Sequence, residues 1–423
     1  MSQPATMAGH WVRRYFQIPL IWKFAVALVA GAIVGLIVGP PIAVIEPLGE
    51  LFLRLLQMLV VPLVIVTLIA GASSISPVQL GRSGVKIFIY YIVTSAAAIC
   101  IGIGLALLVT PGAGLDMPAA DAEEPEEAPP IIDTLLGIVP ENPFTAMVEG
   151  NILGIIFLAV IVGIALGVLR HSESERMREL GEHVRRLTDA GVQIMFMIIR
   201  GVLEYAPIGV FALIAVVLGE TGTDALVPLA SLTGVVYGGV ALQIAFYTVL
   251  LLLIGASVRQ FFGAAREPMM TAFVTRSSSG TLPVTTRAAQ KLGIKEGVYG
   301  FSLPFGATIN MDGTALYVGA STIFVSQVAG IDLSFGEILS VVLVGTLASI
   351  GTAGVPGAGL IMLSLAITQA GLPFAAVALV AGIDALLDMA RTMCNVTGDL
   401  TGTRIVAKTE PGMLAEPEQQ ETS

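Results

Sequence analysis

The sequence is poor in charge, histidine and cysteine, and each shortage excludes a class of protein. Charged residues make up only 12% of the 423 residues and apolar residues 55%, whereas about a quarter of a typical soluble domain is charged. A soluble globular domain is therefore excluded. Three histidines and two cysteines, Cys100 and Cys394, are too few for a disulfide framework or a Cys/His metal site. We expect both cysteines to be small buried apolar side chains, and the net charge of −10 does not favour a nucleic-acid partner.

Long apolar runs take the place of the missing charge. A run of about 18 or more apolar residues is long enough to cross a lipid bilayer. The runs occupy residues 24–45, 55–75, 87–110, 152–169, 194–218, 226–255, 300–328, 338–372 and 375–397. No small-residue cleavage site follows the first run, so we expect a retained helix there rather than a removable signal peptide. The sequence predicts an all-α polytopic membrane protein.

The positions of Lys and Arg predict the orientation of the chain. Neither residue occurs in three long stretches, 87–169, 201–258 and 296–390. The positive-inside rule places the basic loops between these stretches in the cytoplasm. Both termini then lie on the cytoplasmic side of the cell (inner) membrane. The longest external connection, 111–143, is rich in Pro, Ala, Asp and Glu, which is typical of a solvated loop.

Polar and glycine-rich interruptions at membrane depth are confined to the C-terminal half. They lie at residues 276–283, 306–314 and 351–359. Unpaired backbone groups are costly in lipid, so such interruptions occur only inside protein or beside a wet cavity. The first and third are followed by long apolar runs at corresponding positions. Broken segments at matching positions of two repeats favour a transporter site between them.

The last apolar run carries a polar stripe. Asp384, Asp388, Arg391, Asn395 and Asp399 recur at steps of four, three, four and four, with Thr392 beside them. At about 100° per residue, these side chains share one face of a helix. Ionisable residues inside the membrane are functional candidates, although a self-neutralising stripe between packed helices is the structural alternative. An Arg fork that binds carboxylates next to an Asp that binds amines suits an acidic amino acid.

The sequence around Asp312 indicates a cation site. Asn310, Asp312 and Gly313 favour non-helical backbone, and an unwound segment exposes carbonyl oxygens beside the carboxylate. Oxygen ligands suit a small hard cation such as sodium. A helix kink without an ion is the alternative interpretation.

The other two interruptions are expected to form the tips of helical hairpins. The serines of 277–279 offer backbone N–H groups at a helix N-terminus, which can receive a carboxylate. The glycines of 351–359 allow close backbone approach and a hinge. Each tip alone is equally typical of a structural turn, but a pair can close on a shared site.

These motifs together resemble the glutamate/aspartate transporter family. The matching segments are 277–279, 310–314, 351–359 and 388–399 (DMARTMCNVTGD), and the likeness is closest to archaeal and bacterial sodium–aspartate symporters. It covers nearly the whole chain in the same order. The resemblance implies a homotrimer whose protomers each have eight transmembrane helices and two re-entrant hairpins, arranged as inverted repeats. It also implies co-transported Na+, no organic cofactor and no enzymatic activity.

The resemblance further implies two domains that move relative to each other. A scaffold would comprise residues 1–82 (helices 1 and 2) and 144–224 (helices 4 and 5). The mobile transport domain would comprise 83–110 (helix 3) and 225–410 (helix 6, hairpin 1, helix 7, hairpin 2 and helix 8). An acidic extracellular loop, 111–143, and a cytoplasmic tail, 411–423, complete the chain. In this family the transport domain crosses the membrane as an elevator.

Site residues follow from the same motifs. The resemblance assigns Arg391 to the side-chain carboxylate of the substrate and Asp388 to its amino group. The other implied substrate residues are Arg276, Ser277, Ser278, Thr314, Val355, Pro356, Gly357, Ala358, Gly359, Thr392 and Asn395. Three sodium sites are implied: Gly306, Asn310, Asn395 and Asp399; Thr308, Ser349, Ile350 and Thr352; and Tyr91, Thr94, Ser95, Asn310 and Asp312.

The expected function is sodium-coupled symport of L-aspartate more than L-glutamate. Neutral-amino-acid relatives lack the equivalent of Arg391, so its presence favours an acidic substrate. A proton-coupled glutamate or C4-dicarboxylate symporter of the same family is the main alternative. An intramembrane aspartyl protease built on Asp384 and Asp388 is disfavoured, because an adjacent Arg keeps Asp388 ionised and the reaction needs a shared proton. A channel is a weaker alternative, since paired tips suit alternating access better than an open pore.

Overall fold

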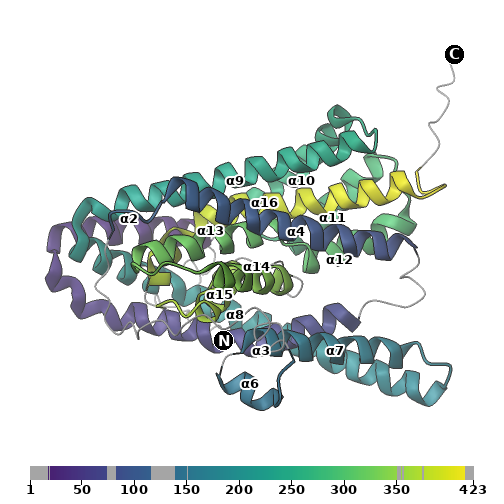
Figure 1. The fold of residues 1–423 in the computed structure, drawn as a ribbon, viewed down its shortest axis with the longest axis horizontal. Helices are drawn as coiled ribbons and strands as arrows, with labels where there is room; N and C mark the ends of the chain where they lie inside the picture. The colour runs from purple at the N-terminus through teal and green to yellow at the C-terminus, as the bar shows by residue number, and fades with distance from the viewer. Residues whose placement is uncertain are drawn as a thin grey trace, which may run out of the picture.

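The computed structural model describes residues 18, 20–73, 82–115, 139–149, 151–349, 354, 357–373 and 376–414. Nearly all of them are helical, and the only β-pairing in these ranges is an isolated bridge between Ile294 and Leu414. Figure 1 shows an elongated helix bundle. In chain order the elements are α2 (Leu20–Val38), η1 (Pro40–Ile45), α3 (Glu46–Ser73), α4 (Arg82–Val109), α6 (Pro143–Glu149), α7 (Ile152–Arg170), α8 (Glu175–Thr221), η2 (Gly222–Ala225), α9 (Leu226–Leu253), α10 (Val258–Thr275), α11 (Ser278–Lys291), α12 (Glu296–Ile309), α13 (Asp312–Val328), α14 (Phe335–Ser349), α15 (Ala358–Gln369) and α16 (Val377–Thr409).

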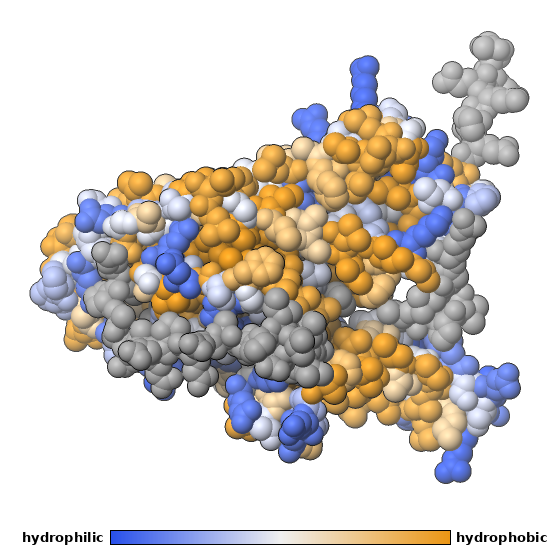
Figure 2. Space-filling model, viewed as in Figure 1, coloured by the Kyte–Doolittle hydropathy of each residue, from blue (hydrophilic) through white to orange (hydrophobic). Residues whose placement is uncertain are grey.

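The outer surface is apolar, as expected for a protein that lies in lipid. Large apolar side chains are exposed on several helices, with Leu108 82% and Val148 88% accessible. Apolar atoms cover much of the face seen in Figure 2. Among the described residues, three helical stretches are long and apolar enough to cross a membrane: Pro40–Ser73, Ser83–Val109 and Glu175–Leu253.

Small residues allow the helices to pack closely. A Cβ atom at Gly35 of α2 would overlap the carbonyl oxygen of Ala215 in α8, and one at Gly209 of α8 would overlap the Phe52 side chain of α3. On the other side of the bundle, a Cβ at Gly102 of α4 would overlap the carbonyl of Leu316 in α13. Close backbone approach through small residues is the usual means of helix packing in membranes.

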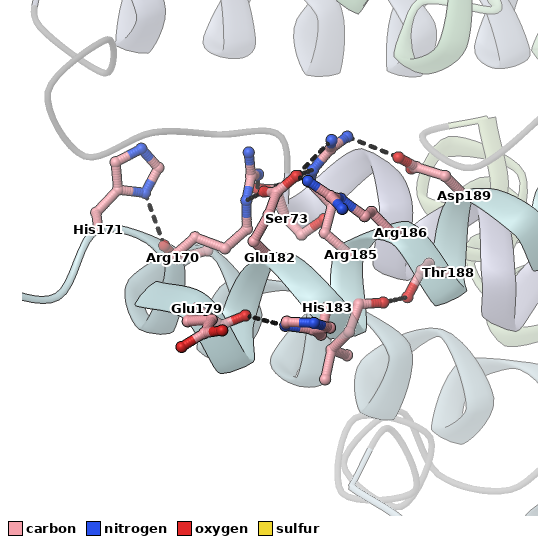
Figure 3. Close-up of polar contacts among 12 residues, drawn as sticks. Ser73, Arg170, His171, Glu179, Glu182, His183, Arg185, Arg186, Thr188 and Asp189 are labelled. Carbon is pink, nitrogen blue, oxygen red and sulfur yellow. Dashed lines mark hydrogen bonds and ion pairs between the residues drawn. The ribbon is translucent and has the colours of Figure 1, made fainter. Parts of the chain in front are cut away.

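The turn between α7 and α8 is a charged hairpin at the end of the arm at the lower right of Figure 1. Glu182 lies near three guanidinium groups, at 2.9 Å from Arg185, 3.5 Å from Arg186 and 3.6 Å from Arg170. Arg170 also donates to the carbonyl of Ser73 at the end of α3 (2.8 Å), as Figure 3 shows. These contacts fasten the arm to the end of α3.

The helices of the C-terminal half are short because three breaks interrupt them. The first break falls at Arg276, which adopts a left-handed conformation (φ 55°) between α10 and α11, while Pro283 lies inside α11. The second is restricted to residues 310–311, between α12 and α13, because Gly306 to Ile309 and Asp312 onward stay helical. At the third, Gly357 has φ 80° and precedes α15. Residues 350–353 and 355–356 lie outside the described ranges.

The prediction for Cys100 was wrong. Cys394 is buried, but Cys100 is exposed. Its position explains the difference, since Val93 and Leu107, seven residues to either side on α4, are 53% and 50% exposed. Cys100 therefore lies on the outward apolar face of α4 and has no core to pack into.

Candidate functional site

A small polar cavity lies where both hairpin breaks meet α13 and α16. Its free volume is about 10 Å³, room for about one water molecule. It is lined by Arg276, Ser278, Met311, Thr314, Gly354, Ala358, Gly359, Asp388, Arg391, Thr392 and Asn395. The lining therefore comes from the first break with α11, the second break with α13, the third break with α15, and the polar face of α16. Nine of the expected substrate residues line it: Arg276, Ser278, Thr314, Ala358, Gly359, Asp388, Arg391, Thr392 and Asn395. Val355 and Pro356 lie outside the described ranges.

Arg391 is the centre of this cavity and is 1% exposed. Its Nη1 donates to Asp384 Oδ1 at 2.7 Å and its Nε donates to Asp388 Oδ1 at 2.9 Å. The guanidinium carbon also lies 4.4 Å from the centre of the Tyr317 ring, a cation–π contact. A buried cation needs such partners, because desolvation of an unpaired charge is prohibitive. Asp384 belongs to the polar stripe predicted from the sequence, but it was not predicted to bind the substrate or an ion.

Asp388 joins α16 to both Arg391 and the third break. Besides Arg391, its Oδ1 accepts from the Thr392 hydroxyl at 3.2 Å, and its Oδ2 accepts from the Gly357 N–H at 3.3 Å. The position of Gly357 explains why it is absent from the cavity wall: its N–H is used to hold Asp388. Arg391 and Arg276 balance the charges of Asp384 and Asp388 around the cavity, and Asp388 is the carboxylate in the wall that could pair with the ammonium group of a ligand.

The two break segments touch each other directly. The Ser277 hydroxyl donates to the Gly354 carbonyl at 2.9 Å, and the Ser279 N–H donates to the same oxygen at 3.2 Å. A Cβ at Gly354 would lie 2.7 Å from the carbonyl oxygen of Ala307, so only glycine allows this approach. Ser277 therefore joins the two tips instead of lining the cavity.

The first expected cation set comes together beneath the cavity. Asn310 Nδ2 donates to Asp399 Oδ1 at 3.0 Å and lies 3.5 Å from the Asn395 carbonyl. A Cβ at Gly306 would lie 2.5 Å from Asp399 Oδ1. The structure thus brings together the Asn310 amide group, the Asn395 carbonyl oxygen and the Asp399 carboxylate around the end of α12.

The set around Asp312 is also assembled, between α4 and α13. Ser95 Oγ donates to Asp312 Oδ1 at 2.6 Å, and Thr94 Oγ1 lies 3.4 Å from Asn310 Oδ1. The Thr94 hydroxyl contacts the carbonyl oxygen of Tyr91 at 3.3 Å. Asp312, Thr94 and Asn310 are all fully buried.

Two residues of α9 complete the surroundings of Asp312 and were not expected. The Tyr247 hydroxyl donates to Asp312 Oδ2 at 2.5 Å, and Gln243 Nε2 lies 3.4 Å from the same oxygen. The only sequence signal was a glutamine and a tyrosine one turn apart in an apolar run, a pattern that is equally typical of helix packing.

Only two members of the remaining cation set lie in the described part of the chain, and the set stays a prediction. The Thr308 hydroxyl is bonded to the carbonyl of Phe305 (3.0 Å), and Ser349 to that of Thr346 (2.7 Å). Each hydroxyl thus donates a hydrogen bond to a carbonyl oxygen of its own helix. Ile350 and Thr352, the other members, lie outside the described ranges.

An all-helical, apolar-surfaced protein with a buried ionic cavity between broken helices has the features of a membrane transporter. Comparison with known proteins agrees: the sodium:dicarboxylate symporter family matches residues 20–409, and the chain belongs to this family. It is 33% identical over 408 residues to a proton/sodium-glutamate symport protein of Bacillus caldotenax, covering 93% of this chain and 95% of that one. A proton/glutamate-aspartate symporter of Escherichia coli is 33% identical over 420 residues (92% and 93% covered). A C4-dicarboxylate transport protein of Rhodospirillum rubrum is 31% identical over 411 residues (94% and 89% covered). The chain is thus a symporter and not an enzyme.

Proposed function

We propose that this symporter carries an acidic amino acid, L-aspartate more than L-glutamate, together with sodium ions. The observation that carries the proposal is the Arg391 guanidinium buried in the cavity beside Asp388, at 2.9 Å. Arg391 would exchange one of its carboxylate partners for the side-chain carboxylate of the substrate. Asp388, held by Thr392 and Gly357, would receive the substrate ammonium.

The chemistry of Asp388 separates amino acids from C4-dicarboxylates. A dicarboxylate without an amino group would bring two negative charges to the cavity and no ammonium group to pair with Asp388. Like charges in a buried site are strongly unfavourable. An acidic amino acid supplies the ammonium that balances Asp388. This argument favours the amino acid over the dicarboxylate named for the Rhodospirillum rubrum relative.

Sodium coupling is supported by the two assembled oxygen sets. Asp312 lies beside the Ser95 hydroxyl, and Asp399 and the Asn395 carbonyl lie on either side of the Asn310 amide nitrogen. Each set thus has one carboxylate near neutral polar groups, and oxygens of such groups are the ligand type of hard cations. Proton coupling is the second candidate, because the relatives include a proton/glutamate-aspartate symporter and a buried carboxylate can also bind a proton.

Uptake into proteoliposomes that contain the purified protein distinguishes the two. With an inward sodium gradient and no pH gradient, we expect uptake of aspartate above glutamate and little uptake of succinate or serine. Asp312→Asn is expected to raise the sodium concentration for half-maximal uptake about tenfold or more, since a carboxylate ligand is replaced by an amide. Uptake that continues without sodium and follows a proton gradient would overturn sodium coupling.

The domain division is part of the proposal. Helices α2, α3, α7 and α8 would form the scaffold (1–82 and 144–224), and α4 and α9–α16 the transport domain (83–110 and 225–410), with α10–α11 and α14–α15 as the re-entrant hairpins. The proposal is supported by the cavity and both cation sets, because all of their residues belong to the helices of the proposed transport domain. A homotrimer with eight transmembrane helices per protomer, elevator movement and both termini in the cytoplasm of the inner membrane are proposed with it. Most of the acidic loop (116–138), the N-terminus (1–17) and the end of the tail (415–423) lie outside the described ranges.

Asp384 is expected to orient Arg391 for the substrate. Asp384→Asn should raise the KM for aspartate about tenfold, because a charge-assisted hydrogen bond is replaced by a neutral one. The sodium concentration needed to stabilise the protein without substrate should stay near that of the unaltered protein. Asp224→Asn, an exposed position outside the cavity, is the matched control. An unchanged KM in Asp384→Asn would contradict this role.

A further inference from the structure

Gln243 holds a buried acceptor that nothing in the described part of the chain satisfies. Its side chain lies on α9 and is fully buried. Nε2 lies 3.2 Å from the Thr94 carbonyl oxygen and 3.4 Å from Asp312 Oδ2. Oε1 has no hydrogen-bond partner. Because both neighbours of Nε2 are acceptors, the orientation of the amide is determined by its surroundings.

An amide oxygen in this position has a cost. A buried acceptor without a donor loses its hydrogen bonds to water and gains nothing in exchange. Few such atoms occur in native proteins, and each requires an explanation. A leucine or methionine would fill the same space on an apolar helix without this cost. The chain nevertheless has an amide here, beside the buried carboxylate of Asp312 in α13.

Most of the groups around Gln243 are oxygen atoms, and no positively charged side chain in the described residues is bonded to them. Asp312 accepts from Ser95 Oγ (2.6 Å) and Tyr247 Oη (2.5 Å), and the Thr94 and Asn310 side-chain oxygens lie 3.4 Å apart. No Lys or Arg side chain is bonded to Asp312 in the described residues. Its negative charge is thus balanced only by neutral donors. The partner that this arrangement lacks is a small cation.

We propose that Gln243 Oε1 is a ligand of the cation that binds at Asp312. This inference rests on the proposed sodium symport and adds a ligand from α9 to those of α4 and α13. The Nε2 contacts to Thr94 and Asp312 hold the Gln243 amide beside the same group of oxygens. Cation binding then joins three helices instead of two.

An amide ligand also favours sodium over a proton. A carboxylate binds either ion, whereas an amide oxygen is too weakly basic to be protonated near neutral pH. An added amide ligand therefore increases the affinity for sodium without increasing that for protons. Gln243 is in this way a selectivity residue for the coupling ion.

Gln327 provides a matched comparison within the same group of helices. It also lies in a helix, α13, but both of its amide atoms are bonded: Oε1 accepts from Gly112 N (2.9 Å) and Nε2 donates to the Ala106 carbonyl (3.2 Å). Its amide fastens the end of α4 to α13. In this structural glutamine the acceptor Oε1 has a hydrogen-bond partner, whereas Oε1 of Gln243 has none in the described residues.

The test measures sodium binding to the purified full-length protein without substrate. The thermal unfolding midpoint is followed as sodium chloride replaces choline chloride at constant ionic strength. We expect Gln243→Met to raise the sodium concentration for half-maximal stabilisation about tenfold. The midpoint in choline chloride should change little, because removal of the unsatisfied acceptor offsets the loss of the two Nε2 contacts. Gln327→Met should lower the midpoint in choline chloride and leave the sodium concentration unchanged.

The outcomes separate this inference from the proposed function. A Gln243→Met protein with the sodium dependence of the unaltered chain would overturn the ligand role, even where its stability changes. Gln243→Glu keeps an oxygen at this position and should retain sodium binding closer to the unaltered protein than Gln243→Met; the reverse order would also count against the ligand role. If Asp312→Asn leaves the sodium response intact, the sodium site at Asp312 fails, and the inference fails with it.

Discussion

Replacement of Arg391 by cysteine should abolish the uptake of aspartate and glutamate. The guanidinium is held by Asp384 at 2.7 Å and Asp388 at 2.9 Å, and its removal leaves both carboxylates without their direct ion-pair partner, which costs about 3–5 kcal/mol of stability. The substrate carboxylate also loses charge-assisted hydrogen bonds of about 1.5–3 kcal/mol each, so kcat/KM should fall about tenfold to a hundredfold for each bond lost. Transport of a neutral amino acid such as serine should become detectable, because the pocket no longer selects a second carboxylate. Uptake of labelled amino acids into proteoliposomes measures both effects.

Arg404→Cys is the matched control for this experiment. Arg404 lies on the same helix and is 8% exposed, but its Nη1 donates to the Leu292 carbonyl at 2.8 Å and it is not part of the cavity wall. Its loss should reduce stability and leave the KM for aspartate within about threefold, since one neutral acceptor is lost. An unchanged affinity for aspartate in Arg391→Cys would refute the role of Arg391. Sodium-dependent stabilisation of Arg391→Cys shows whether the variant is folded.

Gly313→Ala is expected to have the second largest effect. A Cβ at Gly313 would lie 2.6 Å from the Cα of Arg391 and would overlap its carbonyl group. Neither helix can yield easily, because the Gly313 N–H donates to Asn395 Oδ1 at 2.7 Å. The added methyl group would push α13 away from α16 and separate Asp312 and Thr314 from Asn395 and Arg391. We expect both substrate uptake and sodium-dependent stabilisation to fall at least tenfold, because overpacking costs about 1–3 kcal/mol and misplaces two sites at once.

The control for Gly313→Ala is Gly104→Ala on α4, where an added Cβ meets no atom within 4 Å. Alanine also has the higher helix propensity, so this variant should retain uptake and be equally or more stable. Normal sodium-dependent stabilisation and uptake in Gly313→Ala would show that the contact between α13 and α16 is not required.

Part of the site follows from the sequence because helical spacing determines which side chains share a face. Asp388, Arg391 and Asn395 were placed on one face of a helix by their steps of three and four, and they line the same cavity. The Asn310–Asp312 interruption likewise follows from residues that favour non-helical backbone. Both inferences depend on local rules alone.

Other features depend on contacts between distant segments, which spacing does not determine. The stripe contained Asp384, but its bond to Arg391 follows from the rotamers of both side chains in the folded bundle. Gln243 meets Asp312 only because α9 packs beside α4 and α13. The site expected from Thr308 and Ser349 stays a prediction, since its other two members lie outside the described ranges. Cys100 was misjudged since an apolar run does not reveal which of its faces meets lipid.

The direct contact between the two helix tips has a consequence for inhibition. Ser277 and Ser279 both donate to the Gly354 carbonyl, and the tips border a cavity with a free volume of only about 10 Å³. A compound with the head group of an acidic amino acid and a bulky aromatic substituent would find the Arg391 cluster but could not be enclosed. It would hold Gly354 away from Ser277 and stop the cycle before translocation. Such a compound should therefore act as a competitive, non-transported inhibitor. Its size rather than its charge should determine whether it is transported or inhibits.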